Sequence, residues 1–154
     1  MPYLIDGNNV MGRRSGRHRD TAGARRRFIQ ELAGFVAVHR VRVQVVFDGV
    51  PDEEFPEGTT YRSVRILYAK RGSDADSRIK DMIRRSSYKR DMVVVSSDRE
   101  VMSFANRQGT RVMPAARFRT LLDEAGAVDR GKADVGVEDP GSIDEWLEFF
   151  GKPP

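Results

Sequence analysis

Carboxylates follow several apolar runs in this chain of 154 residues. In an open α/β sheet the carboxyl ends of parallel strands meet at one rim, and ligands gather there. One aspartate at such a position is ordinary turn chemistry, but several would place a group of negative charges on that rim. The residues concerned are Asp6, Asp48 and Asp98, which follow apolar runs, and Asp74 and Asp76, which open an expected helix.

Crowded carboxylates in a partly desolvated cleft repel one another unless a cation lies between them. Aspartate and amide oxygens suit Mg²⁺ or Mn²⁺, which retain several waters and also bind phosphates. The chain has no cysteine, and its two histidines, His18 and His39, lack the spacing of a zinc site. The sequence therefore favours a divalent metal held by oxygen ligands, and it excludes disulfides and thiolate catalysis.

Strand-like and helix-like segments alternate along the chain. Apolar runs predict strands, and apolar residues at helical spacing predict the helices between them. The expected strands are 3–6, 41–49, 64–69, 92–98 and 110–113, and the expected helices are 21–39, 74–86, 99–108 and 114–125. We expect loops over 7–19 and 52–60. Because helical crossovers connect parallel strands, we predict a three-layer α/β sandwich built on a five-stranded parallel sheet.

The C-terminal part of the chain differs in charge from the rest. Residues 1–126 carry 24 Lys/Arg and 16 Asp/Glu, a net charge of +8, whereas residues 127–154 carry 3 and 7, a net charge of −4. We therefore predict a basic α/β domain over 1–126, followed by an acidic linker and a short amphipathic helix over 142–150. Ser142 and Glu145 fit a capping box there. Since so short a helix is marginal in water, we expect it to dock on the domain in preference to a partner.

The composition also limits the partners of the protein. No apolar run approaches the ~18–20 residues of a membrane span, and the absence of cysteine agrees with a cytoplasmic location. Because the domain is basic and rich in arginine, we expect a polyanionic partner, nucleic acid before membrane. The cations expected to contact it, unless they are only solvated surface charges, are Arg13, Arg14, Arg17 and Arg19 after the first strand and Lys70 and Arg71 after the third.

Four short blocks of the sequence resemble the motifs of NYN-domain ribonucleases, and of their YacP-like branch in particular. The blocks are Leu4–Asn9, Val46–Gly49, Ala75–Ile79 and Ser96–Glu100, in the order and spacing of that family. The family is related to the PIN-domain and flap nucleases. The resemblance covers about residues 3–125, and it implies a PIN-like fold with strand order 3-2-1-4-5.

The resemblance also implies metal-dependent cleavage of phosphodiester bonds, and the choice of RNA over DNA rests on it alone. The residues that match the motif are Asp6, Asp76 and Asp98 as metal-site acids, Asn8 or Asn9 as positioning groups, and Asp48 as a helper. The family often has two adjacent acids where this chain has Asp76 and Ser77. Whether Asp74 replaces the missing acid is open at this point.

The main expectation is a metal-dependent endoribonuclease that uses Mg²⁺ or Mn²⁺. Ser77 motivates an alternative, a weakly active or non-catalytic adaptor of the same fold that binds RNA or associates with ribosomes. A phosphatase or another phosphotransferase is a third possibility, although a haloacid-dehalogenase phosphatase would need a second aspartate where this chain has Asn8. The sequence leaves the target RNA, the number of metal ions, and the choice between a monomer and a weak dimer open.

Overall fold

The structure is a computed structural model, and it describes residues 2–12, 22–69 and 74–135. Its elements in chain order are β1 (Pro2–Asp6), α1 (Gly7–Gly12), α2 (Ala22–His39), β2 (Arg42–Phe47), β3 (Thr60–Tyr61), β4 (Val64–Tyr68), α3 (Ala75–Arg85), a 3-10 helix (Lys89–Asp91), β5 (Val93–Val95), α4 (Arg99–Arg107), β6 (Arg111–Met113) and α5 (Ala115–Val135). None of the helices in these segments has the length and apolar character needed to cross a membrane.

A six-stranded sheet of order β3-β4-β2-β1-β5-β6 forms the middle layer. Five of the strands are parallel, and they follow the order expected for a PIN-like sheet. The sixth strand, β3, pairs antiparallel with β4 at the edge. The prediction of a five-stranded, wholly parallel sheet was therefore wrong, because the sheet has six strands and is only mostly parallel.

The strand β3 was missed because its turn lacks the usual sequence signal. Thr60 pairs with Arg65 and Tyr61 with Val64, so only two residues connect the strands. Those two residues, Arg62 and Ser63, both have positive φ, 47° and 66°. Two-residue hairpin turns of this kind usually contain Asn-Gly or Asp-Gly, which adopt positive φ with little strain. An Arg-Ser pair therefore does not predict a hairpin turn.

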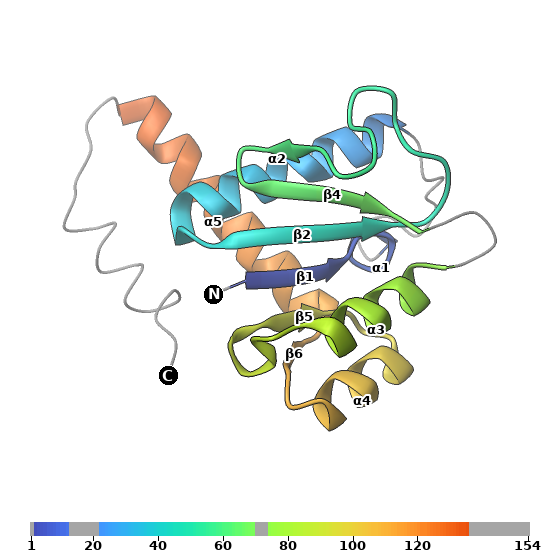
Figure 1. The fold of residues 1–154 in the computed structure, drawn as a ribbon. Helices are drawn as coiled ribbons and strands as arrows, with labels where there is room; N and C mark the ends of the chain where they lie inside the picture. Colours follow the sequence, from blue (N-terminus) through green and yellow to red (C-terminus); the bar gives the residue numbers. More distant parts are fainter. Residues whose placement is uncertain (1, 13–21, 70–73, 136–154) are drawn as a thin grey trace.

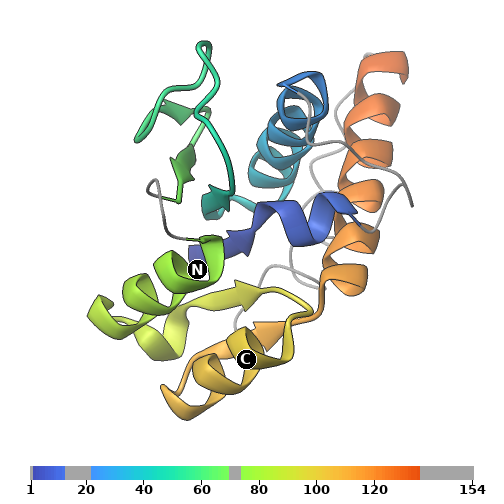
Figure 2. The ribbon, with the colours of Figure 1, turned by 90° about the vertical axis from the view of Figure 1, so that its right-hand side faces the viewer.

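Helices cover both faces of the sheet, with α2 and α5 on one face and α3 and α4 on the other (Figures 1 and 2). Side chains of β1 alternate between the two layers. Ile5 packs in the core cluster that includes Phe28 of α2, whereas Leu4 packs with Ile79 of α3 and Val101 of α4. All five side chains are at most 2% exposed, so the central strands are buried on both faces. This arrangement confirms the three-layer α/β sandwich.

The loop expected over 7–19 begins with a helix, and so does the linker expected after residue 126. Residues 7–12 form α1 directly after β1, because the polar side chains that suggested a loop bond to neighbouring strand ends instead. At the other end, 127–135 belong to α5 and not to the expected linker. Glycine lowers helix stability by only about 1 kcal/mol relative to alanine, so Gly126 and Gly131 do not end this helix. The helix expected over 142–150 lies outside the described residues.

Gly7 is required by close packing at the end of β1. A Cβ atom at this position would lie 2.6 Å from two ring carbons of Phe47 and 2.9 Å from a methyl group of Val45. Both neighbours are fully buried, so neither side chain can turn away into solvent. The glycine thus allows the chain to leave β1 against the end of β2.

We expect Gly7→Ala to lower the free energy of unfolding by about 1–3 kcal/mol, the usual cost of overpacking a core. Denaturant unfolding followed by circular dichroism would measure the loss. Gly34→Ala is the matched control, because a Cβ atom at Gly34 of α2 would meet no atom within 4 Å. That variant should be neutral, or more stable by up to about 1 kcal/mol. Equal losses in the two variants would contradict the packing argument.

Candidate metal centre

The carboxyl ends of three neighbouring strands carry acidic residues to one rim of the sheet, the rim turned toward the viewer in Figure 2. β1 ends at Asp6, β2 ends one residue before Asp48, and β5 leads through two serines to Asp98. β1 pairs with both β2 and β5, so the three strand ends are adjacent. The sheet topology alone therefore places these aspartates at the same rim.

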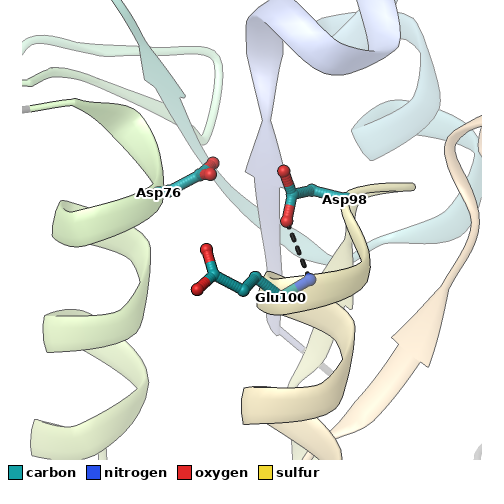
Figure 3. Close-up of side chains that lie close together, drawn as sticks. All are labelled: Asp76, Asp98 and Glu100. Carbon is teal, nitrogen blue, oxygen red and sulfur yellow. Dashed lines mark hydrogen bonds between the residues drawn. The ribbon is translucent and has the colours of Figure 1, made fainter.

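Three carboxylates converge between the first turns of α3 and α4 (Figure 3). One oxygen from each of Asp76, Asp98 and Glu100 lies within 4.8 Å of the others. Asp98 is the N-cap of α4, and its Oδ1 accepts hydrogen bonds from the backbone N–H groups of Glu100 (2.9 Å) and Val101 (3.2 Å). The cap fixes the position of Asp98. We call Asp76, Asp98 and Glu100 the acidic cluster.

Asp6 lies deeper than the acidic cluster and is only 4% exposed. Its burial and the nearby charge of Asp76 raise its pKa to about 7, with a smaller contribution from Asp48. Hydrogen bonds act in the opposite direction, including one from Ser96 Oγ to Asp6 Oδ2 at 3.2 Å. The ionised form of Asp6 is therefore under-stabilised by the described residues alone.

Asp76 also has a raised pKa, of about 6. Burial is the largest cause, followed by the negative charges of Asp98 and Asp74, while the positive charge of Lys80 acts in the opposite direction. Lys80 Nζ lies 3.5 Å from Glu100 Oε2 at the edge of the acidic cluster. The mutual repulsion of these carboxylates is the electrostatic condition that a bound cation relieves.

Two adjacent asparagines connect β1 to the ends of its neighbours. Asn8 Oδ1 accepts a hydrogen bond from the backbone N–H of Asp48, and Asn9 Oδ1 accepts one from that of Ser97, each at 2.8 Å. Asp48 Oδ1 in turn accepts a hydrogen bond from the backbone N–H of Ala75, also at 2.8 Å. The asparagines and Asp48 thus position the starts of α3 and α4, from which the acidic cluster projects.

Two serines after β5 complete this network. Ser96 Oγ accepts a hydrogen bond from the backbone N–H of Asp98 at 3.1 Å and donates one to Asp6. Ser97 Oγ accepts a hydrogen bond from the backbone N–H of Ala115, at the start of α5, at 2.9 Å. Ser96 therefore links the buried carboxylate of β1 to the N-cap of α4. Neither serine was assigned a role from the sequence.

The model of the YacP-like NYN domain family matches residues 3–138, most of the chain. The chain belongs to this family. Members of the NYN family are generally nucleases, and the acidic cluster lies within the matched residues. The match confirms the resemblance drawn from the four sequence blocks. No curated protein sequence matches the chain.

Solved structures show that the fold of this YacP-like NYN domain has close counterparts. One crystal structure of Rae1 (YacP) from Bacillus subtilis is 22% identical, with a TM-score of 0.68, and the match covers 97% of this chain and 92% of that chain. A variant of the same protein, with leucine in place of a tryptophan, is 21% identical with a TM-score of 0.69, and the match covers 96% and 90%. At these identities the likeness shows a shared fold.

The acidic cluster of the YacP-like NYN chain contains two of the acids expected from its sequence, Asp76 and Asp98. Asp74 has a different position. It is the N-cap of α3, and its Oδ1 accepts a hydrogen bond from the backbone N–H of Ser77 at 2.8 Å, which lowers its pKa. Asp74 therefore caps α3, and the third carboxylate of the cluster comes from Glu100.

Glu100 is a carboxylate of the site that was not predicted from the sequence. It lies two residues after Asp98, inside a block that resembles the NYN family, and it is in the first turn of α4. This position could have indicated a metal-binding role from the sequence, because an acidic residue in the first turn of a helix can share a cation with acids nearby. The expected nucleic-acid contacts, Arg13, Arg14, Arg17, Arg19, Lys70 and Arg71, lie outside the described residues.

Proposed function

We propose that this protein is a metal-dependent endoribonuclease that hydrolyses RNA phosphodiester bonds at the acidic cluster. The observation that carries the proposal is the convergence of Asp76, Asp98 and Glu100 beside the buried Asp6. Membership of the YacP-like NYN family supports nuclease chemistry at this rim. The proposal assigns the ligand roles to the acidic cluster and Asp6, and positioning roles to the network of Asn8, Asn9 and Asp48.

The donor set fits Mg²⁺ or Mn²⁺. All three members of the acidic cluster offer carboxylate oxygens, which these hard cations prefer. The cluster contains no nitrogen or sulfur donor of the kind that zinc usually takes. Burial and repulsion raise the pKa of both Asp6 and Asp76. The positive charge of a divalent cation at this rim would lower both pKa values and so favour the ionised carboxylates.

A divalent cation bound here would supply a polarised water and neutralise charge on the phosphate oxygens. Other groups of the chain hold the carboxylate ligands in place. Asp98 keeps its orientation through the N-cap, and Ser96 holds the Oδ2 atom of Asp6. Lys80, paired with Glu100, adds a positive charge at the edge of the cluster, where a phosphate oxygen would be attracted. Arg13, Arg14, Arg17, Arg19, Lys70 and Arg71, which lie outside the described residues, are our proposed RNA contacts.

Cleavage of a labelled single-stranded RNA by the purified protein tests this function. We expect cleavage in Mn²⁺ or Mg²⁺, none after EDTA, and recovery when the ion is restored. An Asp98→Asn variant purified in parallel controls for contaminating nucleases. Cleavage that persists in EDTA, or that is undiminished in the variant, would contradict the proposal. RNA binding without cleavage in Mn²⁺ would instead indicate the adaptor.

A further inference from the structure

A second surface with charged side chains lies at the opposite rim of the sheet, where the parallel strands begin. It forms a surface hollow of about 880 Å³, lined in part by Arg40, Arg42 and Arg65. Arg42 belongs to β2 and Arg65 to β4, and these strands are neighbours. We call these three arginines the amino-rim arginines. All three are exposed.

The amino-rim arginines are not neutralised by the rest of the described chain. None of them forms an ion pair with a residue in 2–12, 22–69 or 74–135. One aspartate, Asp91, also lines the hollow. The pKa of Glu57 is lowered mainly by its hydrogen bond with Arg78, with which it is paired at 2.8 Å, and only to a small extent by the charge of Arg65. Three arginines against one aspartate leave the hollow positively charged.

The backbone around the hollow adopts conformations that favour glycine. Arg40 has a φ of 55° and Ser63 a φ of 66°, and both line the hollow. Arg40 N donates a hydrogen bond to Val36 O at 2.7 Å, which closes the C-terminus of α2 at a position where glycine is usual. Both conformations belong to turns, the end of α2 and the β3–β4 hairpin, so glycine can replace Arg40 without strain.

An exposed aromatic ring completes the surface. Tyr88 lines the hollow and is 59% exposed, one of the two largely exposed apolar side chains in the described segments. A positive groove with an aromatic side chain is the combination that binds single-stranded nucleic acid without sequence preference. The arginines would meet phosphates, and the ring would stack on a base.

We propose that the amino-rim arginines and Tyr88 form a second binding site for single-stranded RNA, in which the arginines contact phosphates and the ring stacks on a base. The choice of RNA as the polyanion rests on the proposed function. The strand β2 spans Arg42–Phe47, so this site lies about 16 Å from the acidic cluster's rim. An RNA that reaches both rims would be anchored away from the bond that is cut.

Binding of a labelled single-stranded RNA, long enough to span both rims, tests the second site in EDTA, where no metal is bound and no cleavage occurs. The Arg42→Ala/Arg65→Ala double variant should weaken binding at low salt by about tenfold or more. It should also flatten the slope of log K against log salt by about 1.4, because each lost phosphate contact on a single strand removes about 0.7. Arg40→Gly should flatten the slope by about 0.7 without lowering the melting temperature, since glycine fits the φ of that position.

The matched control keeps the charge at the same two positions. Arg42→Lys/Arg65→Lys retains both positive charges on the exposed ends of β2 and β4, so it should leave the slope nearly unchanged. Equal slopes in the two double variants, or weaker binding with no change of slope, would overturn the second site. Such a result with RNA cleavage intact would leave the proposed function standing. Conversely, absence of cleavage in Mn²⁺ with the slope effect present would overturn only the nuclease.

Discussion

Asp6→Asn is expected to abolish RNA cleavage and, in the absence of metal at pH 8, to make the protein more stable. The two effects have one cause. The buried carboxylate of Asp6 adds negative charge to the metal site, and the same charge is costly without the cation. Asparagine keeps the size of the side chain and can still accept the hydrogen bond from Ser96 Oγ, so the fold should be retained.

The stability effect should depend on pH with a definite sign. The pKa of Asp6 is raised from 3.8 to about 7 in the folded protein, so between these values the folded state holds a proton that the unfolded state has lost. Stability from this group is therefore complete below about pH 4, falls as the pH rises, and is lost above about pH 7. Thermal unfolding from pH 4 to 8 should show this fall in the wild type and much less of it in Asp6→Asn. At pH 8 we expect the variant to be more stable by about 2 kcal/mol, a rise of about 4–8 °C in Tm.

Asp52→Asn is the matched control for the pH experiment. Asp52 is also buried, but its hydrogen bonds with Arg26 lower its pKa. Neutralising Asp52 should therefore destabilise the protein at pH 8, opposite in sign to Asp6→Asn. Saturating Mn²⁺ should raise the Tm of the wild type and narrow or reverse its difference from Asp6→Asn, because the metal binds the folded state. A wild type that is as stable as Asp6→Asn across this pH range would contradict the electrostatic account.

Asp98→Asn should reduce RNA cleavage by about 10²–10³-fold and leave the fold intact. Asparagine is as good an N-cap as aspartate, so the hydrogen bonds to the N–H groups of Glu100 and Val101 can be kept. The variant loses one negatively charged ligand of the cation. We expect this loss to reduce transition-state stabilisation by about 3–4 kcal/mol. Single-turnover cleavage in Mn²⁺, together with a melting curve, would measure both properties.

Asp74→Asn separates the metal role of an aspartate from its capping role. Asp74 caps α3 as Asp98 caps α4, but it lies outside the acidic cluster. We expect Asp74→Asn to change cleavage by less than about tenfold, because it alters only the field around Asp76. A loss as large as that of Asp98→Asn would show that Asp74 is a ligand, as one reading of the sequence allowed.

The sequence was sufficient to predict the five parallel strands and the rim at which their aspartates lie. The central strands are buried on both faces, so they appear as continuous apolar runs, and Asp6 and Asp48 follow two of these runs directly. The carboxyl ends of parallel strands necessarily share a rim. The order of the five parallel strands came from the family resemblance and could not be read from the runs themselves.

Other features depend on tertiary contacts that one sequence does not reveal. The asparagines after β1 looked like loop residues, but Asn8 and Asn9 bond to residues about 40 and 88 positions away. Glu100 reaches the acidic cluster only because α3 and α4 pack side by side, which brings it opposite Asp76. The same packing supplies a third carboxylate beside Asp76 and Asp98, although Ser77 stands where the family often has an adjacent acid.

The most direct test of the account is the position of a bound Mn²⁺ ion, located by its anomalous scattering in crystals of the metal-loaded protein. We expect a peak at the acidic cluster, with oxygens of Asp76, Asp98, Glu100 and Asp6 at about 2.0–2.2 Å and waters completing the shell. The Asp98→Asn variant should show a weaker peak or none. An ordered Mn²⁺ ion bound elsewhere at saturating concentration, with the acidic cluster empty, would contradict the account.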